Sequence, residues 1–168
     1  MLGFYENFPV NVHQVASIYS TTSRRKMQKS LVRILHKFNQ RKFRLEDISY
    51  PSIPKCKVVF EFGIAKSNIF NYLDTHETSK VLKIAHTDPF RIMDFFCAIR
   101  YYTMRNGKEN SLKFDYYMLR FTFYDETTEI LIFHERGPRH ISPNELINLI
   151  IYRIGQMFPN RIRIGFEA

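Results

Sequence analysis

Two long segments with alternating side chains flank an Asn-Gly pair and predict a β-hairpin. In residues 92–105 the alternate positions Met93, Phe95, Cys97, Ile99 and Tyr101 are apolar or aromatic, and residues 111–124 repeat this at Tyr117, Leu119, Phe121 and Phe123. A period of two places alternate side chains on opposite faces of a strand. Asn-Gly at 106–107 is a favoured two-residue hairpin turn. These segments therefore predict two antiparallel strands with one buried face.

Shorter segments with the same period predict further strands on either side of this hairpin. Alternation and turn residues place strands at residues 57–64 and 69–73 before it, and at 129–135 after it. The tail carries a last candidate strand at residues 161–166. The sequence therefore predicts an antiparallel sheet of about five strands.

Helix start signals precede three segments with apolar residues at helical spacing. These segments are residues 24–39 behind Ser23, residues 75–86 behind Asp74, and residues 143–157 behind Ser142, with Pro143 and Glu145 in the first turn. A weaker helical pattern covers residues 10–19, and Pro51 and Pro54 make residues 45–57 a connector. We expect an α+β fold in which two helices cover one face of the sheet and a basic N-terminal helical segment, residues 1–45, precedes it.

Length and composition indicate one soluble domain spanning residues 1–168, with residues 57–168 forming the sheet and its two helices. Hydrophobic residues make up 45% of the chain and charged residues 24%, as in ordinary globular proteins. No apolar run approaches the roughly 18 residues of a membrane span, and the N-terminus lacks a secretory signal pattern. The absence of such a run leads us to expect no association with membranes. Two cysteines cannot form a disulfide scaffold, so we expect a cytoplasmic protein.

The positive charge of the chain is concentrated near the N-terminus. The formal net charge is +9, and residues 1–57 carry eleven Lys or Arg against three Asp or Glu. Within residues 24–44 nine positions are basic and none is acidic: Arg24, Arg25, Lys26, Lys29, Arg33, Lys37, Arg41, Lys42 and Arg44. Such a cluster favours a nucleic-acid partner, because Lys and Arg neutralise phosphates and release counterions. An acidic protein partner or a merely solvated charged face are the alternatives.

The polar face of the two long strands is a second candidate for nucleic-acid binding. Alternation places Arg100, Tyr102, Tyr116, Arg120, Thr122 and Tyr124 on one sheet surface. Aromatic and arginine side chains on an open sheet suit the stacking of unpaired bases. They suit a protein interface equally well, or they simply cover the outer face of the sheet.

The segment 134–140, His-Glu-Arg-Gly-Pro-Arg-His, is a candidate anion site between a strand and a capped helix. Arg136, Arg139 and His140 lie where a helix N-terminus attracts anions. His134 or His140 could act as a general acid or base. The alternative is a structural loop whose polar side chains satisfy backbone groups. The spacing of its histidines does not fit a zinc-protease helix.

Motifs for nucleotide, zinc or acyl-transfer chemistry are absent from the sequence, so we expect no cofactor and no metal. Asp94 and Asp115 could meet across the hairpin as a carboxylate pair for a metal, but such residues more often pair with Arg or Lys on an adjacent strand, and Arg100 and Lys113 are available. We therefore expect a non-enzymatic, basic RNA- or DNA-binding protein, for example a small subunit of a nucleic-acid-handling assembly. The alternatives are an assembly module that docks an acidic protein, and an enzyme or binder of phosphorylated ligands at loop 134–140.

Overall fold

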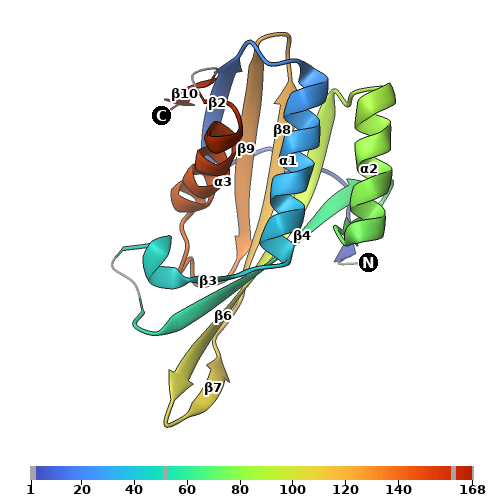
Figure 1. Ribbon diagram of the computed structural model, residues 1–168. Helices are drawn as coiled ribbons and strands as arrows, with labels where there is room; N and C mark the ends of the chain where they lie inside the picture. The colour runs from blue at the N-terminus through green and yellow to red at the C-terminus, as the bar shows by residue number, and fades with distance from the viewer. Residues whose placement is uncertain (1–2, 51–52, 160–161, 168) are drawn as a thin grey trace.

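The computed structural model describes residues 3–50, 53–159 and 162–167, and it shows an antiparallel sheet with three helices on one face (Figure 1). The strands are β1 Gly3–Phe4, β2 Gln14–Ser20, β3 Lys42–Arg44, β4 Cys56–Lys66, β5 Ile69–Tyr72, β6 Ile92–Arg105, β7 Lys108–Ser111, β8 Asp115–Phe123, β9 Thr127–Arg136 and β10 Ile162–Glu167. The helices are α1 Arg24–Asn39, α2 Thr75–Thr87 and α3 Pro143–Met157, and Leu45–Asp47 forms a single 3₁₀ turn.

The sheet is larger than the sequence predicted. It has ten strands in the order β1-β5-β4-β6-β8-β9-β2-β10, with β3 paired to β4 and β7 paired to β6, instead of about five. All pairs are antiparallel. The additional strands are mostly short ones, which owe their conformation to their partners more than to their own sequence. The expected α+β class is confirmed, with three helices over the sheet where two were expected.

The basic N-terminal helical segment is only partly helical. The helix expected at residues 10–19 is wrong: β2 occupies Gln14–Ser20 and is hydrogen-bonded to β9 on one side and to β10 on the other. Ala16 and Ile18 point into the core, so the short alternation prevails over the weak helical spacing. Lys42–Arg44 is likewise a strand, because Phe43 is buried and pairs with Val58 of β4.

The three helices begin where the sequence predicted. The side chains of Ser23, Asp74 and Ser142 each accept a hydrogen bond from a backbone N–H three residues on, and Ser142 and Glu145 form a capping box. The expected strand at 111–124 is interrupted: β7 ends at Ser111 and β8 begins at Asp115. No helix among the described residues is long and apolar enough to cross a membrane.

The core lies between the helices and the inner face of the sheet. Four buried phenylalanines from β4, β6 and β8 form its centre: Phe60, Phe62, Phe95 and Phe121. Helix α1 packs on them with Leu31, Leu35 and Phe38, which leaves its basic side facing outward. Burial of this stripe fixes the orientation of α1. Each Å² of apolar surface removed from water stabilises the packed helix by roughly 25 cal/mol.

The opposite, outer face of the sheet is partly covered by the N-terminal segment, which runs behind the strands in Figure 1. Tyr5 donates a hydrogen bond to Asp94 on β6, the guanidinium of Arg120 lies 4.8 Å from the centre of the Phe8 ring, and His13 stacks on Phe133 of β9. This segment therefore occupies sheet surface that would otherwise be open to a partner.

Candidate functional site

Helix α1 carries the largest part of the predicted basic cluster. Arg24, Arg25, Lys26, Lys29, Arg33 and Lys37 lie on α1, Arg41 follows its C-cap, and Lys42 and Arg44 lie on β3. Every one of the nine is exposed or half-exposed. Figure 1 shows α1 between α2 and α3 on one face of the sheet. The apolar stripe of α1 is buried in the core, so its basic side chains lie on the outer side of the helix.

Few of these cations have an acidic partner. Arg44 pairs with Asp47 at 3.0 Å and with Glu46, whereas Arg24 lies 3.8 Å from the fully exposed Asp125. Lys29 contacts the ring of His86 on α2 at 3.0 Å. Within the described parts of the chain, no carboxylate lies within ion-pair distance of the other six, namely Arg25, Lys26, Arg33, Lys37, Arg41 and Lys42.

The other two helices extend the same charge. Together α1, α2 and α3 carry nine Lys or Arg and only two Glu. Both glutamates are engaged: Glu77 is buried 3.6 Å from Lys66, and Glu145 belongs to the capping box of α3. The three additional cations, Lys80, Lys83 and Arg153, were not among the predicted site residues. Their only signal in the sequence is that they fall on the polar sides of α2 and α3.

Two hollows flank α1, and both are lined by cations. A groove of about 320 Å³ between α1 and α2 is lined by Lys29, Arg33, Lys83 and His86, together with Ser79, Leu82 and Thr87. A smaller cavity of about 170 Å³ between α1 and α3 is lined by Lys37, Arg41 and Arg153, together with Ile34, Phe38, Gln156 and Met157. No carboxylate contributes to either lining.

The sheet-face candidates are not brought together in the same way. Arg100 pairs with Glu61 at 2.8 Å, and Arg120 holds both oxygens of Asp94 at 2.8 Å, so both guanidinium groups are already neutralised. Thr122 is buried. Tyr124 follows the far end of β8 from Tyr116, which separates them by roughly 25 Å at about 3.3 Å per residue.

Near Tyr116 the outer face forms a row of aromatic rings, and the guanidinium of one arginine lies over the last ring. Phe70, Phe96 and Tyr116 have ring centres 5.4 and 5.8 Å apart, and the guanidinium of Arg136 lies 4.3 Å from the centre of the Tyr116 ring. Tyr102 is half-exposed farther along β6, toward the β7 hairpin. Since Arg136 already covers one face of Tyr116, that ring offers less surface for a base than the sequence suggested.

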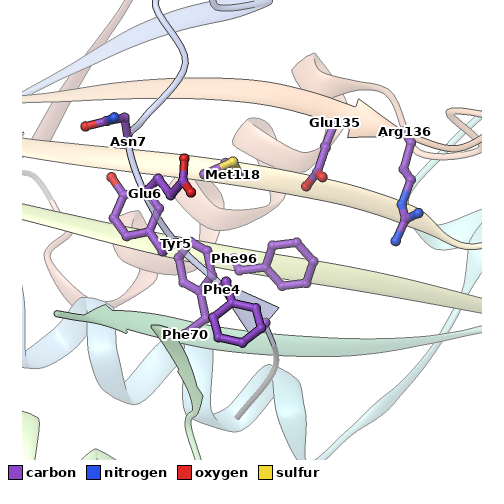
Figure 2. A pocket seen from close by; sticks show the side chains of 10 residues that line it. Phe4, Tyr5, Glu6, Asn7, Phe70, Phe96, Met118, Glu135 and Arg136 are labelled. Atoms are coloured by element: carbon purple, nitrogen blue, oxygen red, sulfur yellow. The ribbon is translucent and has the colours of Figure 1, made fainter. Parts of the chain in front are cut away.

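A shallow cleft of about 410 Å³ lies where the N-terminal segment crosses this row (Figure 2). Phe70, Phe96 and Met118 line it from the sheet, and Tyr5 lines it from the N-terminal segment. Its polar groups have mixed signs, because Glu6 and Glu135 lie in the lining with Arg136. The cleft therefore lacks the uniform charge of the hollows beside α1.

Loop 134–140 is organised around Asp115, a fully buried carboxylate at the start of β8. Its Oδ1 accepts hydrogen bonds from His134 Nε2 at 2.8 Å and from the backbone N–H of Arg139 at 2.7 Å. Its Oδ2 accepts from the Tyr101 hydroxyl at 2.5 Å and from the backbone N–H of His140 at 3.0 Å. Four hydrogen-bond donors thus stabilise one buried carboxylate and hold the loop against the sheet.

The hydrogen-bond donors that could bind an anion in this loop already have acceptors within the protein. The backbone N–H groups of Arg139 and His140 point at Asp115, and the Ser142 side chain occupies the N–H of Glu145. Arg139 Nε donates to His134 Nδ1 at 3.2 Å on the inner face, whereas Arg136 lies on Tyr116 on the outer face. The two arginines therefore do not converge on one ligand position.

No family model, curated protein or solved structure matches this chain significantly.

The aspartate pair considered for a metal is also separated. Asp94 lies on the outer face with Arg120, and Asp115 lies on the inner face of the same sheet. Neither uses Arg100 or Lys113, the partners expected from the sequence. Across the residues that the structure describes, no group of three or more His, Cys, Asp or Glu side chains is arranged to hold a metal ion.

Gly137 is the residue that lets the loop approach Asp115. Its φ is +118°, and a Cβ built there would lie 2.3 Å from the Phe114 carbonyl oxygen and 2.5 Å from Asp115 Oδ1. We expect Gly137→Ala to lower the free energy of unfolding by about 3 kcal/mol. Gly107→Ala, at a turn glycine with φ +74° and open space around it, is the matched control and should cost about 1 kcal/mol. Equal losses in urea unfolding would show that the close approach is unimportant.

Three buried or half-buried tyrosines make stability depend on alkaline pH. Desolvation and a hydrogen bond to Asp94 raise the pKa of Tyr5 to about 12. Desolvation and Asp115 raise the pKa of Tyr101 and Tyr117 above the usual value. Below about pH 10 both folded and unfolded states hold these protons, and above it only the unfolded state releases them, so stability falls as pH rises. Urea unfolding from about pH 8 to pH 12 should show this loss, reduced in Tyr5→Phe; an unchanged slope in Tyr5→Phe would contradict the contribution of Tyr5.

Proposed function

We propose that this protein binds nucleic acid through the surface formed by its helices, with α1 at the centre. The observation that carries the proposal is the absence of free carboxylates among nine helical Lys and Arg residues, both glutamates being engaged elsewhere. A solvated helical surface normally mixes charges of both signs. A one-signed surface creates a potential that attracts a polyanion and is weakened by salt.

The distribution of the basic residues along α1 supports a phosphate backbone as the partner. Helix α1 has 16 residues, so its basic side extends over roughly 24 Å. This length spans several phosphates of a nucleic-acid strand, and the groove beside Lys29, Arg33 and Lys83 offers a track for them. Contacts of this kind position a strand without reading its sequence, so we propose binding with little sequence preference.

The choice of residues favours nucleic acid over an acidic protein. Five of the nine helical cations are lysines: Lys26, Lys29, Lys37, Lys80 and Lys83. Lysine is depleted in protein–protein interfaces, whereas aromatic residues and methionine are enriched. Helix α1 contains one phenylalanine, Phe38, and no tyrosine, and Phe38 is buried. Apart from the half-buried His36, its exposed side therefore carries no aromatic ring. An acidic protein remains the alternative that the experiment must exclude.

A binding panel tests the proposal. Fluorescence anisotropy at low salt would compare labelled single-stranded RNA, single-stranded DNA and duplex DNA, with polyglutamate as competitor. We expect nucleic acid to bind and polyglutamate at equal charge concentration to displace it poorly. Failure of all three nucleic acids to bind would overturn the proposal. Displacement by polyglutamate as effective as by unlabelled nucleic acid would also overturn it, in favour of an acidic protein partner.

A further inference from the structure

The cavity between α1 and α3 differs from the open groove on the other side of α1. It is about half as large, 170 Å³ against 320 Å³, and three of its seven lining residues are apolar: Ile34, Phe38 and Met157. Its polar lining consists of the cations Lys37, Arg41 and Arg153 and of Gln156, whose side-chain N–H₂ group donates to the Tyr152 hydroxyl at 3.2 Å. An apolar wall lowers the local dielectric, so charges inside such a cavity act more strongly than on an open surface.

Arg153 has a donor without an acceptor. Its Nε is buried, and among the residues that the structure describes it has neither a hydrogen-bond partner nor a carboxylate at ion-pair distance from its guanidinium. Arg100 Nε also lacks a hydrogen bond by geometry, but it is 2.8 Å from Glu61. This Nε is closed to solvent, so a ligand in the cavity would meet the terminal Nη1 and Nη2 groups of Arg153, for which the described residues provide no carboxylate.

Two further cations, Lys37 and Arg41, also support a negatively charged ligand in this cavity. Lys37 lies in the last turn of α1, Arg41 directly follows its C-cap, and both line the cavity. The guanidinium of Arg41 lies 5.0 Å from the centre of the Phe43 ring, which holds it without neutralising it. The α1 dipole favours cations at its C-terminal end and accounts for Lys37. It does not account for Arg153, which lies before the last turn of α3.

We propose that this cavity binds a terminal phosphomonoester. A phosphate inside a nucleic-acid strand continues in two directions and suits the open groove, whereas a terminal phosphate has one substituent and a second negative charge. Arg153, Lys37 and Arg41 would hold its oxygens, and Ile34, Phe38 and Met157 would contact the group it esterifies. The same chemistry occurs at the end of a nucleic-acid strand and in a small phosphate ester. The first source rests on the proposed function, and the second does not.

Two measurements separate these sources. The first compares one short oligonucleotide with and without a 5′- or 3′-phosphate, by anisotropy, on the wild type and on Arg153→Gln. The second titrates phenyl phosphate and inorganic phosphate while NMR follows the Nε–H resonance of Arg153. Lys108→Gln, exposed on β7 and away from both the helices and the cavity, is the matched control for lost charge. Arg153→Lys, which keeps the charge but lacks the Nε–H donor, guards against a folding effect.

A terminal phosphate should strengthen binding roughly tenfold in the wild type and in Lys108→Gln, and by less than twofold in Arg153→Gln. Saturable shifts of Arg153 Nε–H with phenyl phosphate, but no preference for phosphorylated ends, would support the site with a free phosphate ester as ligand. This result could occur even if no nucleic acid bound at all. No end preference together with no shift of Arg153 would overturn the inference, even if α1 bound nucleic acid through its open groove.

Discussion

Asp115→Ala should destabilise the protein by about 3–5 kcal/mol, because it removes a buried charge that four donors share. The imidazole of His134 and the backbone N–H groups of Arg139 and His140 would lose their acceptor inside the protein. With typical domain stabilities of about 5–15 kcal/mol, this change alone could remove much of the margin. The chain has no tryptophan, so urea unfolding is best followed by circular dichroism.

Two companion variants separate the network from the loss of a negative charge. Asp125→Ala removes a fully exposed carboxylate that lies 3.8 Å from Arg24, and it should leave the urea midpoint unchanged. Asp115→Asn keeps the side-chain shape but turns an N–H₂ group toward two donors, so it should behave more like Asp115→Ala. If Asp115→Ala unfolds like the wild type, Asp115 does not hold loop 134–140 in place.

Neutralising the exposed basic side of α1 should weaken nucleic-acid binding by about 100-fold or more at low salt. The variant would carry Gln at Arg25, Lys26, Arg33 and Lys37, all exposed and none within ion-pair distance of a described carboxylate. Stability should change little, because these positions lie opposite the buried stripe of Leu31, Leu35 and Phe38. Anisotropy measures the affinity, and circular dichroism verifies the fold.

The matched control removes the same charge from another part of the surface. Lys57, Arg105, Lys108 and Lys113 are exposed around the β6–β7 hairpin, which projects beyond the sheet in Figure 1. Replacing all four by Gln lowers the net charge equally but leaves the helices intact. We expect this control to lose far less affinity than the α1 variant. Equal losses would mean that binding follows net charge and has no defined surface.

Local signals predicted the long elements well because those signals lie within the elements themselves. The ends of β6 at 92 and 105, and of α3 at 143 and 157, coincide with the predicted ones; Asn-Gly marks the end of β6, and the Ser142 capping box marks the start of α3. Strands β1, β3 and β7 were not predicted as separate strands. Each has two to four residues and is held by a neighbouring strand, which no local pattern encodes.

The candidate site was predictable in its charges and not in its geometry. The basic run of residues 24–44 is visible in the sequence, but the hollows beside α1 also need Lys83 from α2 and Arg153 from α3. Asp115 shows the same limit. The sequence offered Arg100 and Lys113 as its partners, whereas two of its four donors are backbone N–H groups of a loop more than 20 residues away. Every residue except proline has a backbone N–H group, so the sequence does not show which of these groups will bind a carboxylate.

The salt dependence of binding tests the nucleic-acid interface most directly. The slope of log Kobs against log salt concentration counts the phosphates that the protein neutralises, at about 0.9 per contact for duplex and 0.7 for single strands. The wild type should give a steep negative slope, and the α1 variant should give one shallower by about 3 on either substrate. A wild-type slope near zero, or the same slope in both proteins, would contradict the account.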